Sequence, residues 1–144
     1  MKSTFNSSYI VGFVDGEGCF CITINKNGER LPEIRLLFEI ELREDDKPIL
    51  ERIRETLGCG QIYHLEYASH SKWQPHVKLK VSNFKDISQK IIPFFLKNPL
   101  QAKKRFDFEK FCVVAEMIRN KEHLTPEGVA KIKALRGVGT RWMR

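Results

Sequence analysis

Two carboxylates, Asp15 and Glu17, are separated by one glycine and followed by a second, Gly18. Glycines leave such a turn without bulky neighbours, so a carboxylate there stays open to solvent. Carboxylate oxygens are hard donors of the kind that Mg²⁺ prefers. A bound Mg²⁺ can activate water and neutralise phosphate charge, as hydrolysis of a phosphodiester requires. These residues alone would equally suit a polar turn where a helix stops.

The residues before the acidic turn have the pattern of a short helix. Ser7 or Ser8 can cap its first backbone N–H groups. Gly12 and Gly16 lie one turn apart, so a second backbone could approach that face closely. Apolar residues recur at helical spacing and can face a core, at Ile10, Phe13 and Val14.

The string from Ile10 to Gly18 resembles the LAGLIDADG motif of homing endonucleases. Its apolar start, first glycine, apolar pair, acid, small residue, second acid and final glycine follow in the order of that motif. The resemblance implies an α+β fold, an α-β-β-α-β-β-α core with a saddle-shaped antiparallel sheet. It also implies an intron-encoded, site-specific endonuclease that makes a metal-dependent double-strand break. The expected break has short 3′ overhangs in a long, near-palindromic DNA target.

The resemblance assigns roles to the residues of the acidic turn. In enzymes with this motif the acid at the eighth position binds the metal, which here is Glu17 with Mg²⁺ as cofactor. The carbonyl of Gly16 would assist it. Asp15, at the sixth position, would either brace the helix junction or contact the metal. Gly12, Asp15 and Gly16 are expected at a dimer interface.

The family also places a catalytic lysine near the start of the helix after the second hairpin. Lys103 aligns best and Lys104 is the alternative, with a plain basic helix face as the simpler interpretation. Such a lysine would polarise the attacking water or stabilise phosphate charge. Relatives carry a water-positioning polar residue where Leu42 stands here, so Arg43 or Glu41 substitutes for it or the role is missing.

Alternation of apolar and polar residues predicts two hairpins. Residues 19–25 and 33–43 alternate on either side of an Asn27-Gly28 turn. A looser pattern over 60–67 and 74–82 predicts the second hairpin. Each hairpin would have an apolar back and a polar front.

Helix start and stop signals surround these hairpins. A helix is predicted from Lys47-Pro48, capped by Asp46, to Gly58. Asn83 would cap a short helix through Ile92 that Pro93 ends. Two further helices are predicted to open at Asn98-Pro99 and at Thr125-Pro126, the last reaching about Leu135.

These elements form one predicted domain over residues 1–144. Its core covers about residues 8–120, and an extra C-terminal helix and basic tail occupy 121–144. The acidic motif occurs once, so the working unit is expected to be a homodimer whose first helices pair at a two-fold axis.

The polar front of the sheet is predicted to read DNA, because a two-stranded ribbon fits the major groove. The acids Glu39 and Glu41 would read bases or pair with Arg35 and Arg43. Phosphate contacts are expected from Lys26, Arg30, Arg136, Arg141 and Arg144. The candidate base readers are Cys21, Thr23, Asn25, Arg35, Glu39, Glu41, Arg43, Tyr63, His76, Lys78 and Lys80.

Composition is compatible with a nucleic-acid partner. Lys and Arg number 25 against 18 Asp and Glu, a net charge of +7 that suits a polyanion and also an ordinary soluble protein. The sequence has no long apolar run, so no membrane partner is expected. It shows no secretion signal, so an intracellular location, cytoplasmic or organellar, is expected. Four scattered cysteines disfavour zinc and a disulfide framework.

Two other functions fit the same resemblance. One is a splicing cofactor, or maturase, that binds intron RNA. The other is a DNA-binding regulator without catalysis. An intact Glu17 favours the nuclease.

Overall fold

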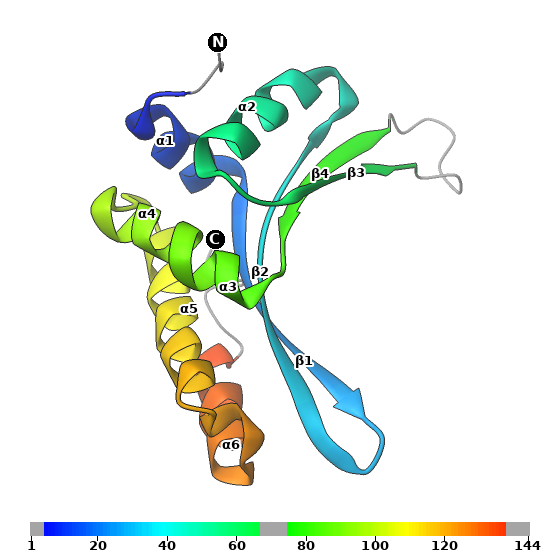
Figure 1. Ribbon diagram of the computed structural model, residues 1–144, viewed down its shortest axis with the longest axis vertical. Helices are drawn as coiled ribbons and strands as arrows, with labels where there is room; N and C mark the ends of the chain where they lie inside the picture. Colours follow the sequence, from blue (N-terminus) through cyan, green and yellow to red (C-terminus); the bar gives the residue numbers. More distant parts are fainter. Residues whose placement is uncertain (1–4, 67–74, 138–144) are drawn as a thin grey trace.

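A four-stranded antiparallel sheet forms the centre of the computed structural model, which describes residues 5–66 and 75–137 (Figure 1). The strand order is β1-β2-β4-β3. Both predicted hairpins are confirmed, although residues 67–74 of the second lie outside the described part. The strands are β1 (Gly18–Asn27), β2 (Arg30–Arg43), β3 (Gln61–Leu65) and β4 (His76–Val81).

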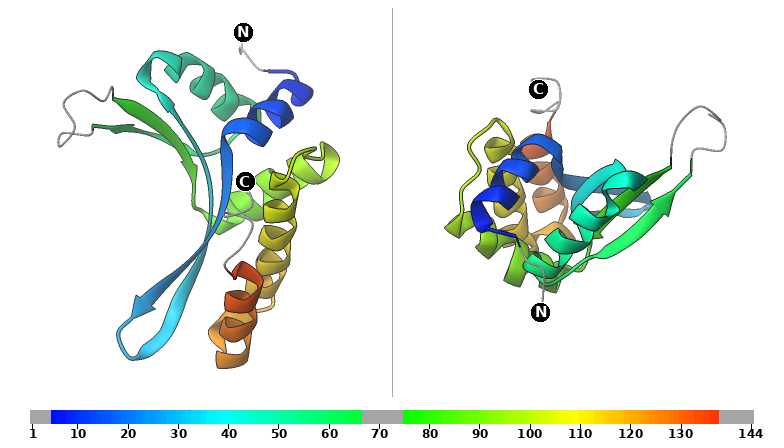
Figure 2. Two further views of the ribbon diagram at one scale, coloured as in Figure 1. Left: turned by 180° about the vertical axis from the view of Figure 1, so that it is seen from behind. Right: turned by 90° about the horizontal axis from the view of Figure 1, so that it is seen from above.

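The helices gather on one side of this twisted, curved sheet and leave its other face uncovered (Figures 1 and 2). They follow the predicted order, and the α+β class is confirmed. The helices are α1 (Ser7–Glu17), α2 (Lys47–Leu57), α3 (Phe84–Asp86), α4 (Ile92–Lys97), α5 (Lys104–Arg119) and α6 (Pro126–Arg136). Shorter helical turns cover Glu44–Asp46, Ile87–Ile91 and Glu122–Leu124.

The core lies between the helices and the back of the sheet. The register of β2 and β4 pairs Phe38 with Val81 and Ile40 with Leu79. Because side chains alternate along a strand, these four residues all point to the buried face of the sheet. Phe20 of β1 joins the two layers. Its ring lies edge-on to Phe95, Phe108 and Phe111, with centroids 5.1–5.4 Å apart. Such aromatic pairs add to the stability that burial provides.

Two predicted helix starts are wrong in detail. The side chain of Asn6, rather than that of Ser7 or Ser8, caps α1 by accepting from the Ser8 N–H at 2.7 Å. Asp46 makes no side-chain cap on α2, because it continues the preceding 3₁₀ turn instead of adopting the extended backbone of a capping residue. The predicted cap Asn83 is confirmed, and so is the predicted helix start at Thr125-Pro126, where the Thr125 side chain accepts from the Gly128 N–H.

Pro93 does not end its helix as predicted. A π turn over 87–91 precedes it, and Pro93 lies at the start of α4, where its missing N–H is tolerated. The helix therefore continues to Lys97. The next helix begins at Lys104 rather than at Pro99, so residues 98–103 form a loop.

The junction of α1 and β1 requires a glycine at position 18. A Cβ there would lie 2.7 Å from the Val14 Cγ1 atom and 3.0 Å from the Val14 carbonyl oxygen. At Gly12 and Gly16 a Cβ would meet no atom of the described chain within 4 Å. The fold therefore needs a glycine at position 18, where there is no space for a side chain. Gly12 and Gly16 face outward.

Gly18→Ala should accordingly destabilise the protein. We expect a loss of about 1–3 kcal/mol in the free energy of unfolding, because the added methyl must displace helix backbone. Gly12→Ala is the matched control and should be neutral or stabilising by up to about 1 kcal/mol. Urea unfolding of both variants measures this difference. Equal midpoints would show that the junction relaxes freely.

Candidate active site and nucleic-acid interface

The acidic turn projects hard oxygen donors from the end of α1. Glu17 is the last residue of the helix, and both it and Gly16 are exposed. Carbonyls in the last turn of a helix lack helical N–H partners, so the Gly16 carbonyl suits the same ligand. These donors fit a hard divalent cation. No cluster of three or more acidic, histidine or cysteine ligands occurs within residues 5–66 and 75–137.

Asp15 joins this turn to the loop before α5. Its Oδ2 atom accepts from the Gln101 N–H at 2.9 Å, and its Oδ1 atom accepts from the Ala102 N–H at 3.1 Å. Hydrogen bonds to an ionised carboxylate are stronger than neutral ones. These two hydrogen bonds are the contacts that the bracing alternative for Asp15 requires, and they join the acidic turn to the loop over residues 98–103.

The two candidate lysines have different surroundings. Lys103 is exposed just before α5, whereas Lys104 in the first turn is only 9% exposed. Lys104 begins the stripe that continues through Phe108 and Phe111, the face of α5 that packs on β1. The two lysines therefore differ in burial, with Lys104 on the packed face of α5 and Lys103 on the exposed turn before it.

The predicted base readers all lie in strands, on the face of the sheet that the helices leave uncovered (Figure 1). Tyr63 is 48% exposed there, and Asn25 is exposed towards the end of the β1–β2 hairpin. Lys26 and Arg30 flank that hairpin turn, and Arg136 ends α6. The remaining predicted phosphate contacts, Arg141 and Arg144, lie outside the described residues.

The acids on this face pair differently from the prediction. Lys78 Nζ lies 3.3 Å from Glu39 Oε2 and 3.7 Å from Glu41 Oε1, and Glu41 Oε2 lies 2.8 Å from His76 Nδ1. A residue directly across on the adjacent strand lies closer than the next residue on the same face of its own strand. The partners of Glu39 and Glu41 therefore come from β4. Arg35 lies beyond the end of β4 and pairs with Glu33 at 2.6 Å.

Leu42 cannot position water at this face. It is buried on the back of β2, opposite Val77, because side chains alternate along a strand. Glu41 and Arg43, its proposed substitutes, both lie on the front. Glu41 is held by the contacts with His76 and Lys78 described above.

Two cysteines meet on the polar front, a contact that the sequence pattern did not reveal. Cys19 and Cys21 lie on the same face of β1 with their Sγ atoms 2.7 Å apart. The hydrogen bond with Cys19, together with burial, holds the pKa of the Cys21 thiol far above its usual range. Burial raises the pKa values of Cys59 and Cys112 to about 11, so both remain protonated thiols at neutral pH.

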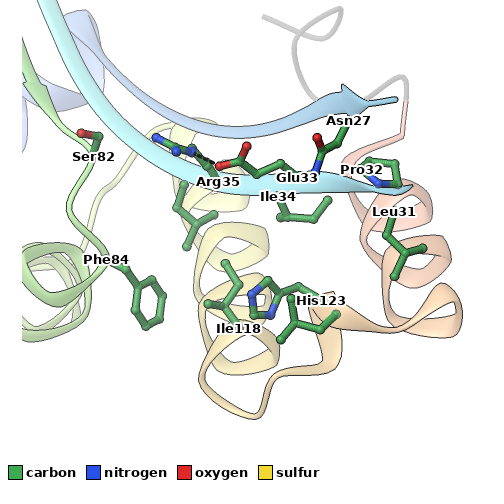
Figure 3. Close-up of a pocket in the computed structure, with 12 residues that line it drawn as sticks. Asn27, Leu31, Pro32, Glu33, Ile34, Arg35, Ser82, Phe84, Ile118 and His123 are labelled. Carbon is green, nitrogen blue, oxygen red and sulfur yellow. Dashed lines mark hydrogen bonds and ion pairs between the residues drawn. The ribbon is translucent and has the colours of Figure 1, made fainter. Parts of the chain in front are cut away.

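A cavity lies on the opposite side of the β1–β2 hairpin, between β2 and the turn after α5 (Figure 3). Leu31, Ile34, Phe84, Ile118 and Leu124 give it a largely apolar lining. His123 also lines it, and its Nδ1 atom is buried without a hydrogen-bond partner among the described residues. Burial lowers the pKa of His123. None of the predicted site residues except Arg35 borders this cavity.

One known protein family matches the part of the chain that contains both the acidic turn and the sheet. The family model described as LAGLIDADG endonuclease matches residues 10–115. The chain belongs to the LAGLIDADG endonuclease family. The matched range begins at the first residue of the motif and extends through the sheet into α5.

Two curated relatives are fungal proteins named as intron-encoded endonucleases. The chain is 33% identical over 130 residues to the "Probable intron-encoded endonuclease 3" of Neurospora crassa, covering 90% of this chain and 23% of that protein. It is 30% identical over 105 residues to the "Probable intron-encoded DNA endonuclease 1" of Mycosarcoma maydis, covering 72% and 35%. The chain thus spans about a third or less of these two relatives.

Solved LAGLIDADG structures share the fold. The meganuclease I-SmaMI bound to uncleaveable DNA superimposes with a TM-score of 0.83 at 34% identity, covering 92% of this chain and 44% of that one. The I-LtrWI LAGLIDADG homing endonuclease bound to target DNA gives a TM-score of 0.83 at 31% identity, covering 93% of this chain and 44% of that one.

In residues 5–66 and 75–137 no helix has the length and apolarity needed to cross a membrane.

Proposed function

We propose that this LAGLIDADG protein is an intron-encoded homing endonuclease that makes a Mg²⁺-dependent double-strand break in a long, near-palindromic DNA site. The observation that carries the proposal is the exposed Glu17 turn beside an uncovered strand face with paired basic and acidic side chains. Family members bound to DNA support it. A form of I-SmaMI bound to uncleaved DNA in the presence of calcium ions supports a divalent cation.

Each residue of the site has a defined task in this proposal. Glu17 and the Gly16 carbonyl would hold Mg²⁺, which when bound supplies charge neutralisation and water activation. Asp15 keeps the turn in register with the loop before α5 through its two backbone hydrogen bonds. The lysine at the start of α5 would stabilise negative charge on the phosphate. Glu41, whose Oε2 atom is held by His76 Nδ1, would orient a water from the front of β2.

A homodimer completes this site. Residues 5–66 and 75–137 present one acidic turn, whereas cutting both strands of a duplex requires chemistry at two phosphates. The open faces of Gly12 and Gly16 support pairing of two α1 helices, because the chain itself fills neither space. Pairing about a two-fold axis would place two Glu17 turns side by side and two sheets over successive half-sites.

The lysine pair gives a direct comparison. We expect Lys104→Met to slow single-turnover cleavage about 10- to 100-fold, the range for losing one preorganised donor, and Lys103→Met to matter less. The burial of Lys104 on the β1-facing stripe supports this order. Melting curves of both variants separate rate from stability. If Lys103→Met lowered the cleavage rate more than Lys104→Met at equal stability, Lys103 would be the lysine that stabilises the phosphate charge.

Specificity and general affinity should separate on the sheet. Arg35→Ala is expected to relax base preference at one symmetric pair of positions, costing about 1–3 kcal/mol per lost contact. Lys78→Ala should weaken binding to all sequences, because Glu39 and Glu41 would then face the DNA without their shared cation. Binding to a target library measures both, with the exposed Lys131 of α6, changed to alanine, as control. If neither variant changed the affinity or the base preference, the DNA-binding surface would lie outside this face of the sheet.

Incubation with a plasmid carrying the protein's own intron-insertion site tests the function. The expected product is linear DNA with short 3′ overhangs when Mg²⁺ is present and uncut plasmid when it is absent. Binding without cleavage in Mg²⁺ would instead support a DNA-binding regulator. Binding to the intron RNA alone would support the splicing cofactor.

A further inference from the structure

A pair of thiols lies directly beyond the acidic turn, on the face proposed to meet DNA. Cys19 and Cys21 point to the same side of β1, because side chains two apart in a strand share a face. Their Sγ atoms are 2.7 Å apart, about 0.7 Å longer than a disulfide bond. Cys21 Sγ also donates to Glu39 Oε1 at 3.8 Å. Cys59 and Cys112 make no comparable sulfur contact among the described residues.

We propose that Cys19 and Cys21 form a reversible disulfide under peroxide and that this bond switches off cleavage. The function of the pair as a switch rests on the nuclease activity proposed above. Formation of the bond does not, so the two parts can be tested separately.

The oxidation is balanced with hydrogen peroxide as the oxidant. Cys19 sulfur attacks one peroxide oxygen, the O–O bond breaks, and the leaving hydroxide takes the Cys19 thiol proton as the first water. The resulting Cys19 sulfenic acid is attacked by Cys21 sulfur, which displaces hydroxide from it. The Cys21 proton passes through the Glu39 carboxylate to that hydroxide, giving the second water. Two thiols lose two electrons in total, and the peroxide gains them.

The bond would distort the strand where it leaves the catalytic turn. Residues two apart in an extended strand must be drawn together before their sulfurs reach bonding distance, so the backbone between Cys19 and Cys21 has to pucker. Gly18 and Glu17 immediately precede it and would shift with it. A displacement of about 1 Å in a catalytic group can cost about 100-fold in rate. The strain also makes the disulfide easy to reduce, as a reversible switch requires.

Mass spectrometry of the full chain tests the bond itself. Trypsin cuts after Lys2 and Lys26, so both thiols fall in one peptide that contains neither Cys59 nor Cys112. After brief treatment with peroxide, this peptide should be two hydrogens lighter and should regain them with dithiothreitol. Oxygen addition at Cys19 or Cys21 without loss of two hydrogens would overturn the proposal.

Single-turnover cleavage of the same samples tests the switch. We expect the rate to fall about 100-fold on oxidation and to return on reduction. Cys19→Ser should cut normally and resist peroxide, whereas the Cys59→Ser/Cys112→Ser double variant should remain sensitive. A disulfide that leaves the rate unchanged would overturn the switch. A reduced protein that does not cut would count against the nuclease, and the peptide result would still decide the disulfide.

Discussion

Glu17→Gln is expected to lower single-turnover cleavage at least about 1,000-fold, because a bound metal ion supplies several kcal/mol to such a reaction. Glutamine keeps the size of the side chain and removes the charge that holds the cation. Glu17 is exposed at the end of α1, so folding should change by less than about 0.5 kcal/mol. DNA binding should survive, since one acid fewer near the phosphates reduces repulsion.

The measurement uses saturating protein with Mg²⁺ present and compares cleavage with binding in the same buffer. Glu51→Gln, an exposed acid on α2, is the matched control and should cut normally. Cleavage by Glu17→Gln near the rate of the unaltered protein would place the metal elsewhere, and the proposed mechanism would fail.

Gly12→Leu is expected to abolish both assembly and cleavage without unfolding the chain. No atom of the described chain lies within 4 Å of a Cβ at this position, so a single protomer has room for the side chain. Leucine is also a better helix former than glycine, which favours α1 itself. The added side chain would instead hold two paired helices apart, beyond the close approach that glycines allow.

Light scattering and thermal unfolding together measure this effect. The variant should have the mass of one chain, unfold in one cooperative transition and leave the target uncut. Ala130→Leu enlarges an exposed position of α6 in the same way and should remain dimeric and active. An active unaltered protein with the mass of a single chain at the assay concentration would contradict the dimer.

The sequence was sufficient wherever one local pattern dominates. Strict alternation in β1 and β2 predicted which side chains are buried, because a period of two assigns each residue to one face. The acidic motif, the cap at Asn83 and the helix start at Thr125-Pro126 are also local signals, formed by residues within a few positions of each other. The fold class and the family followed from these patterns, and the comparisons confirm both.

Contacts between distant residues were decided only by the tertiary structure. Asp15 finds its partners at Gln101 and Ala102, in a loop where the sequence predicted the start of a helix. Glu39 and Glu41 pair with Lys78 of another strand, because register sets cross-strand neighbours and sequence spacing does not. Crowding at Gly18, open space at Gly12 and the burial of Lys104 likewise depend on how α1, β1 and α5 pack. Local patterns thus determined the elements and the motif, and packing determined which side chains can act together.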